Sequence, residues 1–464
     1  MKELKNMKET TFIEKSVIET TAEESFTWHE RPGALQRLTP PWQSMKVTSQ
    51  TSGIKTGTKV RMINYFFGVP VTLEAEHIAY NKGRFFQDTL IKSPFASWVH
   101  SHSFFKSEND TSILEDKINY KLPFYFPWFM KGLIRNELKR IFRYRHDVFI
   151  NDIKRHKQSE KPLTVLLSGA SGLLGSALVP FFTTGGHHVY TLVRREPDLS
   201  KNEILWDPAS GTLDLSTIEH IDVVINLNGA PLAEGRWTDK RKQLIIKSRT
   251  TSTALLAKKI AERDQKPELF LSASAIGYYG DCGDREITEN DKPGTIFISD
   301  VCNQWEDAAE KAVAAGVRTV FGRIGVVLTS GGGALSQMLP AFKAGAGAKI
   351  SNGNQQMSWI SLEDTIGAIW HLIMNQEIEG PVNIVAPSPV TNKTFTKILG
   401  RVLGRPAFFR IPSILVKIIW GQMGQEILLA GTKVKPEKLL KTGFKFNHES
   451  LEEALRAVMG RMKN

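Results

Sequence analysis

The sequence contains little cysteine and no long apolar run. Only Cys282 and Cys302 occur among the 464 residues, too few for a disulfide framework, and neither has the CxxC partner of a metal or redox site. The charged N-terminal segment lacks the apolar core of a signal peptide. The longest apolar runs, such as residues 411–420, contain proline or lysine and fall short of the ~20 residues of a membrane span. We therefore expect a cytoplasmic protein without a transmembrane segment.

Nucleic-acid-binding motifs are also absent, although basic residues are in excess. Lys and Arg number 60 against 48 for Asp and Glu, but no zinc spacing, RNP motif or isolated basic tail accompanies them. Part of the excess falls in residues 135–146, where apolar residues recur at helical spacing. That pattern favours a solvated helix face over an anion or membrane-surface contact. We expect no nucleic-acid partner, and a small-molecule substrate or hydrophobic ligand instead.

A polar segment at residues 151–162 separates two differently patterned halves, and we interpret it as a domain linker. The second half alternates strand and helix patterns, as in the βαβ units of a parallel sheet. The first half has strand-like runs followed by a long helical pattern from Lys131 to about Asp152. Those runs, bounded by Gly, Asn, Pro and Lys, cover residues 59–67, 71–80, 83–91 and 113–120.

A glycine-rich turn follows the first strand pattern of the second half. Residues 164–168 form an apolar strand pattern, and the segment GASGLLG then leads into an apolar helix pattern at residues 176–183. In such a turn the glycines permit the sharp bend, the approach of a pyrophosphate and close helix–strand packing. The phosphates also meet the N–H groups and dipole of the helix N-terminus. We predict a dinucleotide site, rather than a purely structural turn, at Gly169, Ser171, Gly172, Leu173, Leu174 and Gly175.

The end of the next strand predicts which dinucleotide binds. Residues 188–193 are followed by Arg194 and Arg195, where an NAD enzyme usually places an acid for the ribose hydroxyls. Arginine at this position favours a 2′-phosphate, so NADP(H) is the expected cofactor and NAD(H) the weaker one. The alternative is that both arginines are merely solvated. This alternative stays open because the next acid, Glu196, could still reach a ribose.

A further buried strand pattern at residues 222–226 ends in small polar residues. Ligands bind beyond the carboxyl ends of parallel strands at the topological switch point, so we assign this end to the cofactor ribose. A core strand followed by an ordinary turn is the alternative. The candidate residues are Asn226, Asn228, Gly229 and Ala230.

In this order the motifs resemble those of a known family. Residues 163–460 are similar to the extended short-chain dehydrogenases, and more narrowly to the YfcH-like, epimerase-family NAD(P)-binding proteins. The matching segments include the GASGLLG turn, VINLNGAPLAEGRWT, LSASAIGYYGD and GRIGVVLTSGGGALSQMLPAF. The resemblance implies an α/β domain with a Rossmann-type, doubly wound parallel sheet over residues 162–390, followed by a C-terminal helical extension over residues 391–464.

The first 155 residues resemble the START-type, helix-grip domains of the SRPBCC class. The resemblance rests on WHERPGA from Trp28, PFASWVHSH from Pro94 and FRYRH ending at His146. It implies an α+β domain over residues 1–155, in which a curved antiparallel sheet wraps around a long C-terminal helix and encloses an apolar ligand cavity.

Two histidines of this region are spaced as a metal pair would be. His100 and His102 lie two apart on a strand pattern and therefore share one face. Without a third ligand of the right type nearby, ordinary packing and hydrogen bonding are the favoured interpretation. We predict no metal site.

The resemblance also implies a catalytic set that the sequence retains only in part. Extended dehydrogenases combine a Ser or Thr with a Tyr-x-x-x-Lys pair, in which Lys lowers the Tyr pKa and the phenolate moves the proton. Ser274 falls where the family places its active-site Ser, but Phe297 and Val301 occupy the positions of the Tyr and the Lys. Tyr278 or Tyr279, beside Ser274 in sequence, is the candidate acid; ordinary packing on the cofactor is an equal alternative.

Arg323 could neutralise a cofactor or substrate anion, or serve equally well as a structural ion-pair partner. Two functions stay open. One is an NADP(H)-binding oxidoreductase or epimerase acting on an apolar or aromatic carbonyl compound, and the other is a non-catalytic protein that senses NADP(H) or a ligand. The missing Tyr-Lys pair favours the sensor, whereas Ser274 and the cofactor turn favour the enzyme. The sequence makes no prediction of the oligomeric state.

Overall fold

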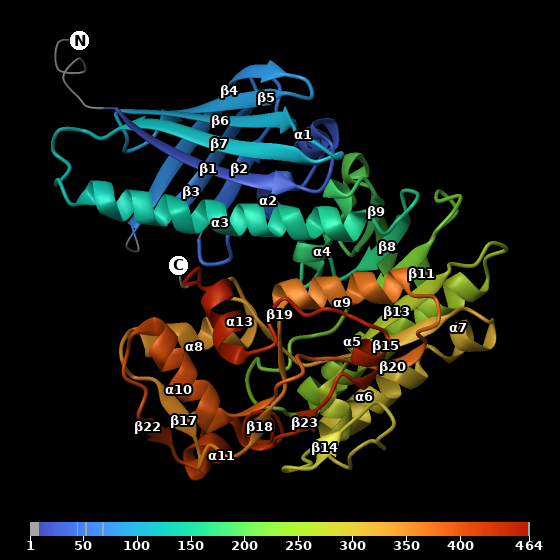
Figure 1. Cartoon of the computed structure of the whole chain (residues 1–464). Helices are drawn as coiled ribbons and strands as arrows, with labels where there is room; N and C mark the ends of the chain where they lie inside the picture. Colours follow the sequence, from blue (N-terminus) through green and yellow to red (C-terminus); the bar gives the residue numbers. More distant parts are fainter. Residues whose placement is uncertain (1–8, 44, 52, 67–68, 463–464) are drawn as a thin grey trace. The chain divides into compact units, whose positions relative to one another are not determined.

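The computed structural model describes residues 9–43, 45–51, 53–66 and 69–462. The chain divides into two compact units (Figure 1). The first unit ends at Glu160 and also takes in Pro180–Gly186, and the second comprises Lys161–Val179 and the chain from His187 onward. Among the described residues, no helix combines the length and the apolar character needed to cross a membrane.

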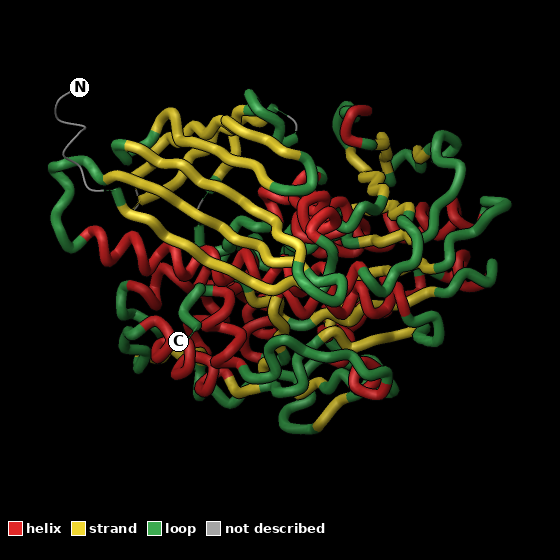
Figure 2. Tube along the Cα trace, turned by 45° about the horizontal axis from the view of Figure 1, so that its top comes forward, coloured by secondary structure: helices red, strands yellow, loops and turns green. Residues whose placement is uncertain are grey.

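The first unit contains a seven-stranded antiparallel sheet, which is among the strands drawn in yellow in Figure 2. Its strands follow the order β1-β7-β6-β5-β4-β3-β2. Buried and partly exposed residues alternate along β7 because only one face of the strand packs against the core. The strands are β1 (Thr10–Ile18), β2 (Lys46–Gln50), β3 (Lys59–Phe66), β4 (Val69–Asn81), β5 (Phe85–Lys92), β6 (Ser97–Lys106) and β7 (Ser112–Lys121).

A long helix, α3 (Met130–His156), lies along this sheet (Figure 1). Its buried side chains, Phe142 and Phe149 among them, pack with strand residues such as Ile118 and Leu114. Two shorter helices, α1 (Ala22–Glu30) and α2 (Ala34–Arg37), complete the unit. The expected succession of strands and then one long helix is confirmed, while the START-type assignment stays a prediction.

The predicted linker at residues 151–162 is wrong in its first half, because α3 continues to His156. Two interactions hold this last stretch in the helix. Ile153 is buried in the core of the first unit, and the buried carboxylate of Asp152 forms an ion pair with Arg37, 2.7 Å from Nε to Oδ2. Asp152, a polar residue of the predicted linker, is therefore an ion-paired residue of the core.

The second unit is built on an eight-stranded sheet in the order β11-β10-β9-β8-β12-β13-β15-β20. All neighbours are parallel except β10 and β11. Because the chain leaves β8 for β9 on one side and later returns to β12 on the other, the switch point lies between β8 and β12. The predicted doubly wound parallel sheet is confirmed. The strands are β8 (Thr164–Ser168), β9 (His188–Val193), β10 (Glu203–Asp207), β11 (Thr212–Leu213), β12 (Val223–Asn226), β13 (Leu269–Ala275), β15 (Thr319–Ile324) and β20 (Gly380–Ile384).

Helices pack on this sheet and form a second core beyond it. Side chains of α5 and α7 bury one face of the central strands. The later helices α8, α10 and α13 pack together with the short strands β16 and β19. The helices are α4 (Gly175–Thr184), α5 (Asp239–Ala261), α6 (Phe297–Asp307), α7 (Glu310–Ala314), α8 (Gly333–Lys343), α9 (Leu362–Met374), α10 (Asn392–Leu403), α11 (Ser413–Met423), α12 (Glu437–Lys441) and α13 (Leu451–Val458). The short strands are β14 (Glu286–Ile287), β16 (Val326–Leu328), β17 (Ala348–Ile350), β18 (Gln356–Met357), β19 (Trp359–Ser361), β21 (Val390–Thr391), β22 (Phe409–Ile411) and β23 (Lys433–Val434).

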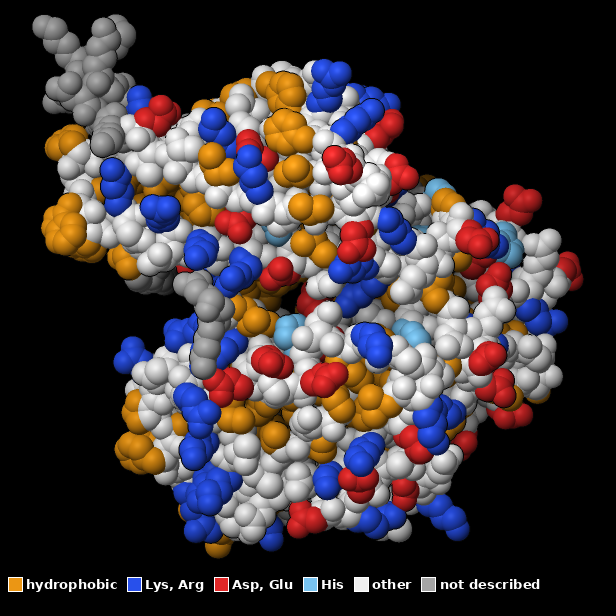
Figure 3. Space-filling model, in the orientation of Figure 1, with side chains coloured by type: hydrophobic (Ala, Val, Ile, Leu, Met, Phe, Trp, Pro, Cys, Tyr) orange, Lys and Arg blue, Asp and Glu red, His pale blue; other side chains and the backbone are white. Residues whose placement is uncertain are grey.

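Charged side chains of both signs occur over both units on the face that Figure 3 shows. The chain carries a formal net charge of +12. Basic residues are thus accompanied by acidic ones on this face, as expected for an ordinary solvated surface.

Candidate functional site

The turn between β8 and α4 leaves no room for a side chain at Gly169 or Gly175. Gly169 has a φ of +78°, in the left-handed region, and a Cβ there would lie 3.0 Å from the backbone oxygen of Leu227. A Cβ on Gly175 would lie 2.2 Å from the carbonyl oxygen of Gly169. The Gly172 N–H donates a hydrogen bond of 3.0 Å to that same carbonyl. These contacts bring the helix start close against the end of β8.

The backbone N–H groups just before α4 are free to donate hydrogen bonds to an anion. No described residue accepts a hydrogen bond from the N–H of Leu173 or Leu174, the two residues that precede the helix. Ser171 and Gly172 are exposed. Unpaired N–H groups at a helix start attract phosphate oxygens. The turn therefore fits the pyrophosphate of a dinucleotide.

The two arginines after β9 differ in their surroundings, although both are exposed. Arg195 forms a two-pronged ion pair with Glu203 at the start of β10, with distances of 2.7 and 2.6 Å. No carboxylate in the described part of the chain lies within ion-pair distance of Arg194. Arg194 is therefore the better placed of the two to meet a 2′-phosphate.

The residues predicted beneath the ribose are tied to the scaffold. Asn226 is fully buried; its Oδ1 accepts from Ser168 Oγ, and its Nδ2 donates to Thr253 Oγ1, both at 2.7 Å. These two hydrogen bonds join β8, β12 and α5, so the side chain supports the shape of the site from within.

The loop after β12 is fixed to α5. The Asn228 side chain donates to the carbonyl of Ser248 at 3.4 Å, and the Ala230 N–H donates to Ser248 Oγ at 2.9 Å. A Cβ on Gly229 would lie 3.0 Å from the guanidinium carbon of Arg249. The loop thus has a defined position beside the carboxyl end of β12.

Ser274 and Arg323 meet at a carboxylate on α6. They face each other across the register of β13 and β15, and each is 3% exposed. Ser274 Oγ donates to Glu306 Oε1 at 2.7 Å, and Arg323 binds both oxygens of Glu306 at 2.9 and 2.8 Å. Burial by itself lowers the pKa of Arg323, but the hydrogen bonds that Arg323 donates to Glu306 outweigh this effect and raise that pKa. The charge of Arg323 is therefore matched inside the protein, as in a structural ion pair.

The two candidate tyrosines lie on a 3₁₀ turn, η3 (Ile276–Tyr279), directly after β13. Tyr279 is 2% exposed; its hydroxyl donates to Asn383 Oδ1 at 2.6 Å and accepts from Arg323 Nη1 at 3.0 Å. Burial raises the pKa of Tyr279 to about 12. Tyr278 is only partly buried, and its ring centroid lies 3.5 Å from the Arg323 guanidinium carbon. No described residue hydrogen-bonds to the Tyr278 hydroxyl, so the structure distinguishes a locked tyrosine from an accessible one.

The helix α6 offers only apolar side chains where the family pair is missing. Phe297 is its first residue and packs against Trp237, with ring centroids 5.1 Å apart. Val301 is fully buried in the same cluster. Burial raises the pKa of the neighbouring Cys302 thiol to about 12, which keeps it protonated. These positions take no part in proton transfer.

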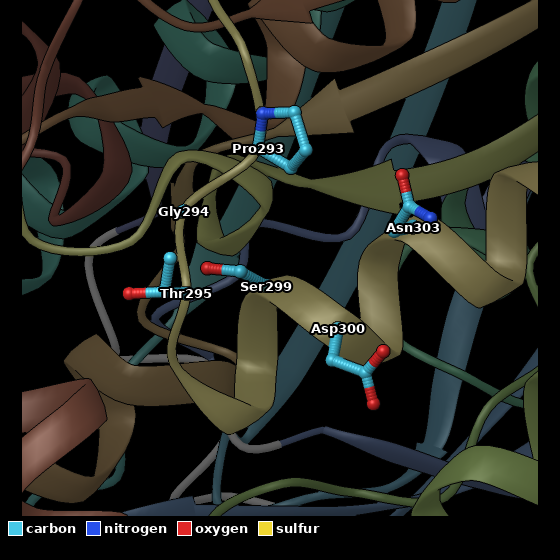
Figure 4. Close-up of a pocket in the computed structure, with 6 residues that line it drawn as sticks. All are labelled: Pro293, Gly294, Thr295, Ser299, Asp300 and Asn303. Atoms are coloured by element: carbon cyan, nitrogen blue, oxygen red, sulfur yellow. The ribbon is translucent and has the colours of Figure 1, made fainter.

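A recess of about 300 Å³ adjoins the tyrosine turn at the start of α6. It is connected to that turn by two hydrogen bonds, from the Gly294 N–H to the Tyr278 carbonyl and from Ser299 Oγ to the Gly277 carbonyl, both 2.9 Å. In Figure 4 the Ser299 hydroxyl points toward the loop of residues 293–295, whereas Asp300 points away from it. The lining residues are Pro293, Gly294, Thr295, Ser299, Asp300 and Asn303.

Sequence reasoning missed Glu306 and Asn383. Asn383 is a buried polar residue one position before the carboxyl end of β20, which is a usable signal for a site residue in a parallel sheet. Glu306 lies in the segment NQWEDAA, and no spacing rule connects it to Ser274 or Arg323. Its contact with both depends on how α6 packs beside β13 and β15.

Comparison with known proteins places the second unit among relatives. The NAD dependent epimerase/dehydratase family matches residues 165–385, and a domain of unknown function matches residues 411–458. An epimerase family protein of Mycobacterium leprae is 41% identical over 298 residues, which are 64% of this chain and 96% of that protein.

Two crystal structures extend the comparison. The nucleoside-diphosphate sugar epimerase from Corynebacterium glutamicum is 29% identical with a TM-score of 0.77, and the match covers 97% of this chain and 90% of that one. A human epimerase family protein with NADPH is 32% identical with a TM-score of 0.59, and the match covers 65% of this chain and 100% of that one. The corynebacterial protein thus has a counterpart of nearly the whole chain.

Proposed function

Because the chain belongs to the epimerase family, we propose that it is an atypical short-chain dehydrogenase or epimerase-like oxidoreductase that binds NADP(H) and acts on a small, largely hydrophobic molecule. The proposal rests above all on one observation. Ser274 is held on the Glu306–Arg323 pair at the carboxyl end of β13, next to the partly accessible Tyr278.

The second unit binds NADP(H) at the carboxyl ends of β8 and β12. The amides of Leu173 and Leu174 would hold the pyrophosphate, and Arg194 would hold the 2′-phosphate. The human relative crystallised with NADPH supports the same choice of cofactor. When bound, the nicotinamide ring supplies or accepts a hydride.

The protein's own residues then position the substrate and move a proton. Ser274 Oγ–H donates a hydrogen bond to Glu306, so the Ser274 oxygen is still able to accept a hydrogen bond from a substrate hydroxyl. Tyr278 is the proposed acid, because Tyr279 already uses its hydroxyl on Asn383 and Arg323. Arg323 and Tyr279 act as positioning residues that hold Tyr278 and Glu306 in place.

The recess at α6 is the proposed substrate side of the site. Thr295, Ser299, Asp300 and Asn303 contribute hydroxyl, carboxylate and amide groups to its lining. We propose a largely hydrophobic substrate because the first unit resembles START-type domains, which implies an apolar ligand cavity. We expect the end that enters the recess to carry a hydroxyl or carbonyl group.

The second candidate function is a binding protein that senses NADP(H) or a ligand. It is favoured by the apolar Phe297 and Val301 on α6, because no Lys assists a tyrosine there. The distinguishing experiment incubates the NADPH-bound protein with a panel of hydrophobic ketones, aldehydes and quinones. Consumption of NADPH absorbance supports the enzyme. If ligands bind and change NADPH affinity while NADPH is never consumed, the protein is the sensor.

A further inference from the structure

Three potential metal ligands converge inside the sheet of the first unit. Asp88 on β5 faces His100 on β6 in the strand register, and His102 shares the face of His100. One ligand atom from each residue lies within 4.8 Å of the other two. The carboxylate oxygen Oδ2 of Asp88 is 3.5 Å from His100 Nδ1 and 3.9 Å from His102 Nε2. Strand pairing supplies the third ligand that was lacking beside the two histidines in the sequence.

We propose that Asp88, His100 and His102 form a binding site for one divalent transition-metal ion of the Zn²⁺ or Fe²⁺ class. Two imidazoles and one carboxylate are a donor set that both ions accept. Ligand atoms bonded to one metal at about 2.0–2.2 Å lie roughly 3.3–3.6 Å apart in a tetrahedral site. The two separations between Asp88 and the histidines, 3.5 and 3.9 Å, lie in or close to that range, and all three ligand atoms lie within 4.8 Å of one another.

In each histidine ring, the nitrogen that faces away from Asp88 lies beside a second carboxylate. Asp116 on β7 lies with Oδ1 3.0 Å from His100 Nε2 and 2.5 Å from His102 Nδ1. His100 Nε2 hydrogen-bonds to Asp116 Oδ1, and when this nitrogen carries the ring proton, His100 Nδ1 presents a lone pair toward Asp88. His102 Nδ1 lies close to the same oxygen without forming a hydrogen bond to it. Metal-binding histidines almost always donate their second N–H to such a carboxylate, which fixes the tautomer and the ring.

Asp116 is itself fixed from the opposite side. His146 of α3 contacts Asp116 Oδ2 through Nε2 at 2.7 Å, and its Nδ1 lies 2.7 Å from Ser16 Oγ. Asp116, His100, His102 and His146 are all buried. The contacts with His146 and, through it, with Ser16 hold Asp116 beside the two ligand rings.

Aromatic side chains restrict the rings further. Phe86 stacks on His102 with centroids 4.2 Å apart, and Phe142 meets His100 edge-on at 5.2 Å. An apolar shell around a polar ligand set excludes water and strengthens metal coordination. The geometry is therefore preorganised around the three ligands.

The competing account is an internal ion-pair cluster without a metal. Burial lowers the pKa of His100, but hydrogen bonds to Asp116 and Asp88 outweigh it and raise that pKa to about 9. A His100 cation could thus balance the two aspartates by itself. The two accounts predict different results when a metal ion is added.

The test uses the full chain without an affinity tag, treated with a chelator and dialysed. Calorimetric titration with Zn²⁺ should show one ion bound per chain. Co²⁺, used as a spectroscopic probe, should give a visible absorption band that Zn²⁺ abolishes. Absence of both signals in the unmodified protein would overturn the proposal in favour of the ion-pair cluster.

Variants assign the site to its ligands. Asp88→Asn and His102→Gln should each abolish Zn²⁺ binding, and Asp116→Asn, which changes a positioning residue, should weaken it by about 10–100-fold. His156→Gln is the matched control: it removes an imidazole of the same unit that packs on Phe181, with ring centroids 4.5 Å apart, and Zn²⁺ binding should persist. Circular dichroism and NADPH binding report folding. Unchanged Zn²⁺ affinity in folded Asp88→Asn and His102→Gln would refute the assignment, and if either variant fails to fold, the Co²⁺ band of the unmodified protein still decides.

Discussion

Replacing Glu306 by glutamine tests the polar cluster at the carboxyl end of β13. The Arg323 side chain is 3% exposed and that of Glu306 is 11% exposed, so solvent screens little of their interaction. Glu306→Gln leaves the guanidinium with a neutral partner and removes the strong acceptor for Ser274. Breaking a buried ion pair in this way costs about 3–5 kcal/mol in the free energy of unfolding.

The assay is urea unfolding of the full chain at fixed NADPH concentration, followed by the fluorescence of bound NADPH as a reporter of the second unit. Glu310→Gln, an exposed acid of the adjacent α7, is the matched control and should change the free energy of unfolding by less than about 0.5 kcal/mol. Adding Arg323→Met to Glu306→Gln should restore part of the loss, because the unpaired charge is then gone. A Glu306→Gln variant as stable as the control would refute the ion-pair account of this cluster.

Four further substitutions probe the cofactor site and the tyrosine pair. In calorimetry, Arg194→Asp should reduce the ratio of NADPH affinity to NADH affinity by about 10–100-fold. Arg195→Asp should reduce this ratio less, because Arg195 is already paired with Glu203. Equal ratios in the two variants would contradict this order. Gly175→Ala places a Cβ 2.2 Å from a backbone oxygen, so we expect a loss of about 1–3 kcal/mol in the free energy of unfolding and weaker NADPH binding, and undisturbed binding would count against the turn as cofactor site. Tyr279→Phe leaves a buried acceptor unpaired, which should lower the free energy of unfolding by about 1–3 kcal/mol in thermal melts; an unchanged melt would show that its hydroxyl contributes nothing.

The alternation of strands and helices in the second unit could be predicted because its strands carry short apolar runs. Residues 164–168 and 188–193 coincide with β8 and β9, since each run is bounded by residues that favour turns. The strands of the first unit are harder to predict from the sequence. Strand β1 was not predicted, because its apolar residues occur as two adjacent pairs, Phe12–Ile13 and Val17–Ile18, instead of alternating with polar ones, and it lies beside a charged terminus.

The sequence singles out candidate site residues one by one but does not predict how they are arranged. Ser274 and Arg323 were singled out from their motifs, yet their meeting on Glu306 depends on strand register and on the packing of α6. In the same way, Asp88 joins His100 only through the pairing of β5 with β6. Such contacts join residues that are distant in sequence, and no local pattern encodes them.

The most direct test of the proposed function is a single-turnover measurement on Tyr278→Phe. The NADPH-bound protein is mixed with a substrate from the carbonyl panel, and the loss of NADPH absorbance is followed for the unmodified protein, Tyr278→Phe and Ser274→Ala. We predict that Tyr278→Phe lowers the rate by about 10²–10⁴-fold, as expected when a positioned acid is lost, while the dissociation constant of NADPH stays the same. An unchanged rate in Tyr278→Phe would contradict the assignment of the acid, and the absence of any NADPH consumption by the unmodified protein with every ligand that it binds would contradict the enzyme itself.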